Sequence, residues 1–310
     1  MTYANSDNLF GLSPYIVDLN NTAYYPTIQS AINQAIVDGH GIAKPTVVFV
    51  RSGTYVEDVT LASGIFMQGV TDSDPFAPRV IISGSVTANA AAANFFSMQN
   101  FTINNPAGNS LILTGTVPIR FVAQDLNINV TAANAWGVDL NCNSGTFGIV
   151  LFYDCQISGD DYGVNIVNHN TLALNRTTVN ANNLAAINVS DNSRLVCGYS
   201  ILQGGSGSSI ILNSVCTSLT SYSELTGPIF CNDTTVMTLH YTSVDAGAVE
   251  GITIAIGASC EAIANIIHSD AASGFWVTGT GTIATGGNNT LTGTAGLIDP
   301  ATTITGFAAG

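Results

Sequence analysis

The sequence predicts an all-β fold in which short strands and turns wind into a solenoid of about ten coils, preceded by one α-helix. Three observations predict it. Strand-like apolar blocks recur every 19 to 29 residues along most of the 310-residue chain. Turns rich in Asn, Gly, Ser and Thr separate these blocks, and only one segment carries a helical pattern. Because a single coil cannot bury its own apolar face, a repeat of this length is typical of stacked coils.

The predicted helix covers residues 26–38. Its apolar residues follow the i, i+3, i+4, i+7, i+8 spacing of one helical face, and they are Ile28, Ala31, Ile32, Ala35 and Ile36. Gly39 then ends the helix. We expect this helix to cover one end of the solenoid, where the outermost strands otherwise leave an open sheet edge.

The predicted strands begin at 46–50, and two more follow within 59–69. Counted between their last apolar residues, the later blocks lie 25, 29, 22, 22, 24, 19 and 23 residues apart. Those last residues are Ile103, Ile128, Ile157, Val179, Ile201, Leu225, Val244 and Ile267. Strand alternation predicts which side chains share one side. The predicted sets are Leu151, Tyr153, Cys155 and Ile157 in one coil and Leu195, Cys197, Tyr199 and Ile201 in another.

We interpret the chain as one domain in three parts. Residues 1–25 form a lead-in or assembly arm, 26–278 the capped solenoid, and 279–310 a tail rich in Thr, Gly and Ala. A tail of this composition needs a neighbouring subunit to hold it in place, which favours self-assembly.

Charge excludes several classes of partner. Only 8% of the residues are Asp, Glu, Lys or Arg, and 20 acidic against 6 basic residues give a net charge of −14. Phosphate contacts need clustered Lys and Arg, so we expect no nucleic-acid binding. The same shortage of cations argues against a strongly anionic polysaccharide. No apolar run approaches the ~18 residues of a membrane span, so we expect no membrane insertion.

The six cysteines are widely spread: Cys142, Cys155, Cys197, Cys216, Cys231 and Cys260. They form no C-x-x-C motif and no zinc-like cluster with histidine. We expect buried thiols that pack as small apolar groups, with one disulfide between neighbouring coils as the alternative. We expect no metal site and no cofactor.

The start of the chain resembles the pectin-lyase-like superfamily. The resemblance lies in residues 25–35 (YPTIQSAINQA), 45–50 (PTVVFV), 53–57 (GTYVE) and 61–69. Members of that family often begin with a T-I-Q-x-A-I helix, a short strand, a P-G-T-Y-x-E segment and a strand ending in Gly. The resemblance implies a right-handed parallel β-helix capped by the helix. It implies architecture and not function.

The catalytic sets of three enzyme classes in that family are incomplete here. Where pectin methylesterases resemble this chain, their two glutamines correspond to Trp136 and Asp161, and their catalytic Asp to Tyr162. The paired carboxylates Asp160 and Asp161 resemble the D-D element of polygalacturonases, a pairing that suits glycosidic hydrolysis. No N-T-D precedes that pair and no R-x-K follows it. Pectate lyases use an Arg base and calcium, but no ligand set surrounds Arg176.

Other candidate residues have structural interpretations beside the functional ones. Glu57, Asp58, Asp72 and Asp74 could hold a cation, or be solvated carboxylates of turns. His169, His240 and His268 fall in different coils and fit turn or ladder positions. The aromatic residues could include an exposed platform for a neutral sugar or stack in the core, and they are Trp136, Tyr153, Tyr162, Tyr222, Tyr241, Phe275 and Trp276.

The sequence therefore favours a non-enzymatic, self-assembling β-helix protein of a fibre, spike or surface appendage. We expect a homo-oligomer, either a trimer or a filament. One alternative is a glycoside hydrolase-like enzyme with Asp160 and Asp161 as its catalytic residues. The structural interpretation of the same two carboxylates is that they cap a polar turn. A further alternative is an adhesin that binds a surface glycan. No classical signal peptide is recognisable, and a virion or extracellular appendage is the favoured location.

Overall fold

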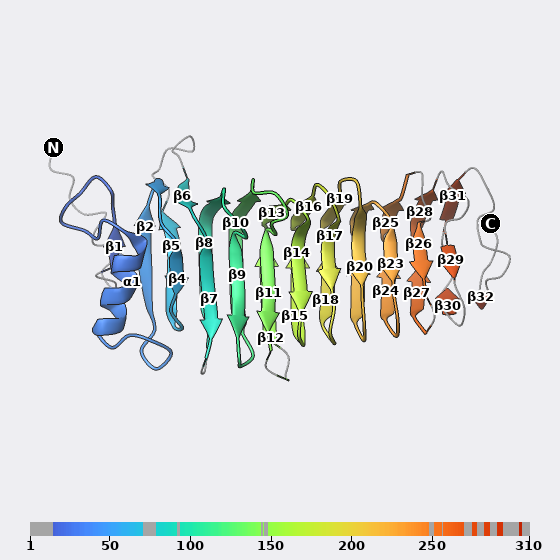
Figure 1. The fold of residues 1–310 in the computed structure, drawn as a ribbon, viewed down its shortest axis with the longest axis horizontal. Coiled ribbons are helices and arrows are strands. Elements are labelled where there is room, and N and C mark those ends of the chain that lie inside the picture. The colour runs from blue at the N-terminus through green and yellow to red at the C-terminus, as the bar shows by residue number, and fades with distance from the viewer. Residues whose placement is uncertain are drawn as a thin grey trace.

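The computed structural model describes residues 15–70, 79–91, 94–143, 145, 148–247, 251–255 and 257–269, with four short strands beyond them. Across this part the chain winds into a rod of stacked coils, with helix α1 (Ile28–Val37) at the N-terminal end (Figure 1). Every pairing between the strands of the described residues is parallel, and one sheet alone contains ten strands. The predicted all-β parallel solenoid with an N-terminal cap helix is confirmed.

Helix α1 forms where the apolar spacing predicts it. Thr27 is the N-cap, and its side chain accepts a hydrogen bond from the Ser30 backbone N–H. The Glu57 carboxylate, from the first coil, accepts the backbone N–H groups of Ile28 and Gln29 at 2.8 and 3.0 Å. These bonds satisfy N–H groups that the first turn of a helix leaves without partners. Four of the five predicted apolar residues are buried, but Ile36 is 49% exposed and not part of the packed face.

Each coil contributes strands to three faces, which the chain visits in a fixed order. The strands of face 1 are β1 (Ile16–Val17), β2 (Thr46–Arg51), β5 (Ile65–Val70), β12 (Gly148–Tyr153), β15 (Asn170–Asn175), β18 (Arg194–Gly198), β21 (Thr217–Ser221), β24 (Val236–His240), β27 (Ser259–Ile263), β30 (Thr282–Thr285) and β32 (Ile304–Thr305). Those of face 2 are β3 (Gly53–Tyr55), β6 (Val80–Ser83), β13 (Gln156–Gly159), β16 (Thr178–Ala181), β19 (Ile201–Gly204), β22 (Glu224–Thr226), β25 (Ser243–Asp245), β28 (Ile266–Ser269) and β31 (Thr290–Gly293).

Face 3 is the ten-stranded sheet. Its strands are β4 (Val59–Leu61), β7 (Val86–Ala90), β9 (Leu111–Gly115), β11 (Val138–Cys142), β14 (Tyr162–Val167), β17 (Ala185–Val189), β20 (Ser208–Leu212), β23 (Ile229–Cys231), β26 (Ile252–Ile254) and β29 (Phe275–Val277). Two long strands, β8 (Phe96–Asn105) and β10 (Arg120–Val130), bend from face 1 into face 2 and join the two. The apolar core fills the space inside the three faces.

The predicted spacing between the last apolar residues of successive blocks matches the pairing of strands on face 2. Ile128 pairs with both Ile103 and Ile157, so the block ends of successive coils stack directly on one another. The one exception is in β19, where Val179 pairs with Leu202 and not with Ile201. Leu202 is fully buried, whereas Ile201 is 36% exposed. Each predicted block therefore contains a corner, which lies within the long strands β8 and β10 and between two strands in the later coils, and the corner shifts the inward positions by one residue.

That corner consists of one residue with a left-handed backbone. We call these residues the corner column, with φ between 48° and 62°: Asn100, Asp125, Asp154, Arg176, Tyr199, Tyr222, Tyr241 and Ala264. Before the corner Val150 and Phe152 point inward, and after it Cys155 and Ile157 do. The predicted sets of residues that share one side are therefore wrong, because alternation does not continue through a left-handed residue. Leu151 and Tyr153 lie on the other side from Cys155 and Ile157, and Tyr199 and Ile201 on the other side from Leu195 and Cys197.

A ladder of buried hydroxyl groups lies just inside the corner column. Its members immediately follow the corner residues, and we call Thr177, Ser200, Ser223 and Thr242 the hydroxyl ladder. The Ser200 hydroxyl accepts the Thr177 N–H at 3.2 Å, and the Ser223 hydroxyl accepts the Ser200 N–H at 3.2 Å. Asn265 continues the pattern by accepting the Thr242 N–H at 2.9 Å. The ladder thus satisfies backbone N–H groups that the turn removes from the strand pairing.

We predict that Ser223→Ala destabilises the protein by about 1–3 kcal/mol, because the buried Ser200 N–H loses its acceptor. Ser221→Ala is the matched control, since the Ser221 side chain is half-buried and outside the ladder. Urea unfolding of the two variants measures the difference. Equal stability of the two variants would contradict a stabilising ladder.

The six thiols are buried and free, as expected, and no disulfide connects the coils. Burial raises the pKa of the Cys142, Cys155 and Cys231 thiols to about 12. Thiols that keep their proton at neutral pH are poor nucleophiles, so these groups serve packing.

Described strands of the two predicted end segments, 1–25 and 279–310, pair with strands of the main solenoid. Strand β1, within the predicted lead-in 1–25, pairs with β2. Strands β30 and β31, within 279–310, pair with β27 and β28. Among the described residues no helix has the length and hydropathy to span a membrane.

Candidate functional site

The predicted catalytic pair lies in the turn between β13 and β14. The Asp160 carboxylate accepts the Asn134 N–H at 2.9 Å from the preceding coil and the Asn183 side-chain amide at 3.0 Å from the following one. That amide also approaches the Asp161 carboxylate at 3.5 Å. Asp160 therefore ties three successive turns together. These contacts are those of a turn cap, and neither carboxylate lines the grooves described below.

The acidic residues near the first coils are also engaged. Glu57 holds the N-terminus of α1, and the Asp58 carboxylate accepts both the N–H and the hydroxyl of Ser85 at 2.7 and 2.8 Å. These bonds lower the pKa of Asp58. Asp72 and Asp74 lie outside the described residues. Within the described part of the chain, no group of three or more His, Cys, Asp or Glu is placed to hold a metal ion.

The histidines and most aromatic candidates do not come together. His169 lies in a turn with φ of 62°, His240 ends β24, and His268 is in β28. Trp136 and Tyr162 pack on each other with ring centroids 6.2 Å apart, and both are half-buried. The side chains of Phe275 and Trp276 lie outside the described residues. The remaining aromatic candidates gather at the corner column.

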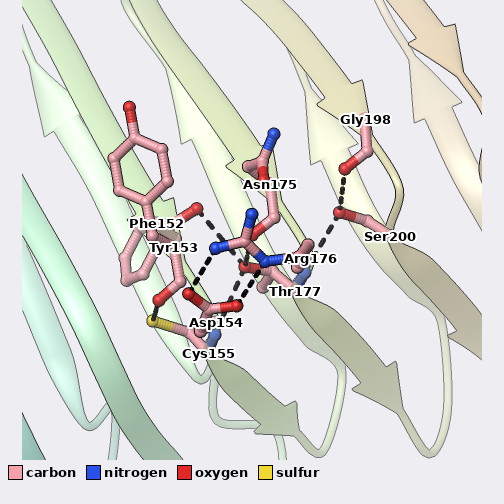
Figure 2. Close-up of polar contacts among 9 residues, drawn as sticks. All are labelled: Phe152, Tyr153, Asp154, Cys155, Asn175, Arg176, Thr177, Gly198 and Ser200. Carbon is pink, nitrogen blue, oxygen red and sulfur yellow. Dashed lines mark hydrogen bonds and ion pairs between the residues drawn. The ribbon is translucent and has the colours of Figure 1, made fainter.

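The middle of the corner column is an ion pair. The Arg176 Nε and Nη2 atoms donate to the two carboxylate oxygens of Asp154 at 2.6 and 2.7 Å (Figure 2). The pair is solvent-exposed, and it connects neighbouring coils. The hydrogen bonds from Arg176 lower the pKa of Asp154, and those to Asp154 raise the pKa of Arg176. The two charges neutralise each other, so this part of the corner offers little net charge to a ligand.

The next three members of the column are stacked tyrosines. The ring centroids of Tyr199 and Tyr222 are 5.1 Å apart, and those of Tyr222 and Tyr241 are 5.0 Å apart. The rings are parallel within 5° and between 52% and 62% exposed. We call Tyr199, Tyr222 and Tyr241 the tyrosine ridge. Three large aromatic side chains thus form one continuous exposed strip along the rod.

Local energetics do not explain tyrosine at these positions. A left-handed backbone costs an ordinary L-residue roughly 1–2 kcal/mol, whereas Gly, Asn and Asp adopt it more readily. Asn100, Asp125 and Asp154 follow that rule in the earlier coils. Two stacked pairs contribute about 1–3 kcal/mol, against roughly 3–6 kcal/mol for three left-handed tyrosines. Strain of this kind, combined with exposed aromatic surface, is typical of a functional site.

Two grooves flank the tyrosine ridge. The larger, of about 570 Å³, lies toward face 2 and is bounded by the ridge on one side. Its other lining residues are Ser200, Ile201, Ser223, Glu224, Thr242, Ser243, Ala264 and Ile266. The smaller, of about 270 Å³, lies toward face 1, and its residues include Tyr153, Asn175, Gly198, Tyr199 and Ser221. Glu224 is the single charged side chain that lines either groove. Both grooves combine aromatic rings with hydroxyl groups, and the smaller one adds the Asn175 amide.

Another polar ladder runs along face 3. Its amide groups donate from one coil to the preceding one, through Asn165, Asn188, Asn213 and Asn232, over 2.8–3.3 Å. The first acceptor is the Asp139 carboxylate, at 3.3 Å from the Asn165 amide. Burial raises the pKa of Asp139, and this hydrogen bond only partly opposes the effect. The ionised carboxylate is thus disfavoured by folding.

We predict that Asp139→Asn raises the melting temperature at pH 7, because the amide oxygen still accepts from Asn165 and carries no charge. The pKa of Asp139 is higher in the folded than in the unfolded chain. The penalty is therefore complete above the folded pKa and disappears as the pH falls through that value and below 3.8, the ordinary value. Thermal melts between pH 3 and pH 8 measure the gain. A gain that stayed constant below pH 3.8 would contradict this cause.

Sequence reasoning found part of this site. It named Tyr153, Tyr222 and Tyr241 as possible platform residues but left out Tyr199, which it set on the same side as Leu195 and Cys197. The sequence does contain a pattern that indicates the ridge: each ridge tyrosine is followed by Ser or Thr, and successive tyrosines lie one coil apart. The hydroxyl enters the buried ladder, which requires the preceding tyrosine to lie on the corner.

Known structures share the fold at low sequence identity. The pectin methylesterase from carrot matches with a TM-score of 0.58 and 15% identity, covering 77% of this chain and 85% of that one. The A-module of mannuronan C-5 epimerase AlgE4 from Azotobacter vinelandii matches with a TM-score of 0.55 and 12% identity, covering 96% and 99%. Pectin methylesterase PemA from Erwinia chrysanthemi matches with a TM-score of 0.51 and 14% identity, covering 74% and 89%.

These neighbours define the class of fold. The chain shares the parallel β-helix fold of these structures, which is the architecture that the resemblance of its first coils implies. No model of a protein family matches the sequence. A comparison with curated proteins finds no match either.

Proposed function

We propose that this protein is a β-helical subunit of a fibre, spike or surface appendage that binds a neutral glycan along its tyrosine ridge. The observation that carries the proposal is the ridge itself: three parallel, exposed tyrosine rings at left-handed corners, where smaller residues fit at lower cost. Tyrosine side chains combine apolar area with a hydroxyl group, which suits a ligand that is apolar on one face and polar at its edges.

The chemistry of the two grooves supports a neutral ligand. The tyrosine and Ser243 hydroxyls of the larger groove, and the Asn175 and Ser221 side chains of the smaller one, can exchange hydrogen bonds with sugar hydroxyl groups. An anionic polymer would need cationic partners, but the one Arg beside the ridge, Arg176, is already paired with Asp154. A net charge of −14 adds long-range repulsion of anions.

The proposal assigns binding and no catalysis to the protein. The carboxylate pair that suits glycosidic chemistry, Asp160 and Asp161, lies in a turn and is engaged by Asn134 and Asn183. Three structural neighbours are named as a pectin methylesterase, an epimerase of mannuronan and a second pectin methylesterase. These names make carbohydrates the first ligands to test.

We predict that Tyr222→Asn reduces glycan binding at least tenfold without unfolding the protein. Asn adopts the left-handed corner readily, which offsets part of the lost stacking. Asp125→Asn is the matched control, since it changes the same corner column four coils away. A glycan array with the full chain identifies ligands, and titration of the strongest with each variant gives the affinities. If wild-type protein binds no glycan, or Tyr222→Asn binds as tightly as wild type, the proposal fails.

We predict that the protein is a homo-oligomer, so that light scattering gives a mass that is a multiple of 32.0 kDa. Two exposed valines in neighbouring coils support this part of the proposal: Val215 is 57% and Val236 47% exposed, on the edge of face 1 away from the ridge. A mass of 32.0 kDa at every concentration removes the subunit part of the proposal and leaves glycan binding to be judged by the array.

A further inference from the structure

One strand glycine has no structural reason to be glycine. Gly198 ends β18, and its φ lies outside the left-handed region. A Cβ atom at this position would meet only the Ser221 Oγ at 3.8 Å and the Asn175 Nδ2 at 4.0 Å, which are ordinary contacts. By contrast, a Cβ at Gly159 or Gly204 would overlap backbone atoms within 2 Å. Glycine in a strand often marks a bulge, a bend or a place where a ligand or another backbone approaches closely. The corner that follows Gly198 does not require glycine, because Tyr153, Asn175 and Ser221 precede the same corner in other coils, and this favours close approach.

The missing side chain leaves a notch in a column of outward-facing residues on face 1. The column runs Tyr153, Asn175, Gly198, Ser221, and each pairs with the next in register. Figure 2 shows Tyr153, Asn175 and Gly198 side by side in successive coils. The notch is the smaller groove of about 270 Å³, closed on one side by Tyr199 of the tyrosine ridge.

The lining of the notch defines the ligand chemistry. Tyr153 and Tyr199 are 37% and 62% exposed and present aromatic carbon. Between them the Asn175 amide offers a donor and an acceptor, and the Ser221 hydroxyl offers both. No charged side chain lines the notch, so a cation or an anion would lose its hydration without gaining an ion pair. An uncharged ring with several hydroxyl groups matches these surfaces.

We propose that the notch at Gly198 is a subsite for one neutral hexose unit. This inference rests on the proposed glycan binding and gives it a location: the sugar ring lies over Gly198, its apolar face against Tyr199 or Tyr153, its hydroxyl groups on Asn175 and Ser221. The rest of the glycan continues along the tyrosine ridge.

The test fills the notch. Gly198→Val places a branched side chain where the sugar would lie, and a strand position favours Val over Gly, so the melting temperature stays equal or rises. Gly108→Val is the control for the substitution itself, since a Cβ there meets nothing within 4 Å and Gly108 lies in the turn between β8 and β9, outside both grooves. The probes are the methyl glycosides of glucose, galactose and mannose, followed by saturation-transfer NMR with the full chain. We expect signals from at least one of them with wild type and Gly108→Val, and at least a fivefold loss with Gly198→Val.

The outcomes separate the subsite from the broader function. If a glycan binds wild type and Gly198→Val equally while Tyr222→Asn loses it, the subsite is wrong and the proposed function stands. If array glycans bind but no methyl hexoside does, a single-hexose subsite is likewise overturned. If wild type binds neither glycans nor methyl hexosides, both proposals are overturned.

Discussion

The structure depends on one constraint, the direct stacking of each coil on the one before it. Parallel pairing places a residue about 4.8 Å from its counterpart in the next coil. The side chains at equivalent positions of successive coils therefore lie next to one another and form a column along the rod. Inside, this produces the continuous apolar core and the hydroxyl ladder of Thr177, Ser200 and Ser223. Outside, it turns single residues into strips, such as the tyrosine ridge and the Asn165–Asn188 ladder.

The left-handed corner is where this constraint shapes function. Turning the chain from face 1 to face 2 with one residue points that side chain outward, and a large side chain there is more than half exposed. Successive corners then align, so the chemistry of the corner changes along the rod: amide and carboxylate first, then the Asp154–Arg176 pair, then three tyrosines. The backbone cost of tyrosine is borne at each of three coils. The buried hydroxyl that follows each tyrosine holds the turn in place, so the exposed ring rests on a rigid base.

Because the chain has few charged residues, these outer strips consist mainly of uncharged side chains. With 8% charged residues, the rod offers hydroxyl, amide and aromatic groups over long distances, and it uses several of its carboxylates internally. Glu57 holds the cap helix, Asp58 holds Ser85, and Asp160 joins three turns. The same residues are the ones that a search for acid–base chemistry selects. Their geometry explains why paired acidic residues in a solenoid need a structural interpretation before a catalytic one.

The sequence by itself determined the solenoid, its cap helix and its period, because apolar spacing along the chain reports directly which strands bury their side chains. It also predicted free, buried cysteines, and Tyr222 and Tyr241 as candidates for exposure. It did not determine which way Tyr153, Tyr199 and Ile201 point. A left-handed residue has no strict signature when it is Tyr or Arg, and one such residue reverses the alternation that follows. Only the tertiary structure decided that these corners align, and alignment across coils joined residues some 20 positions apart into the ridge and the notch at Gly198.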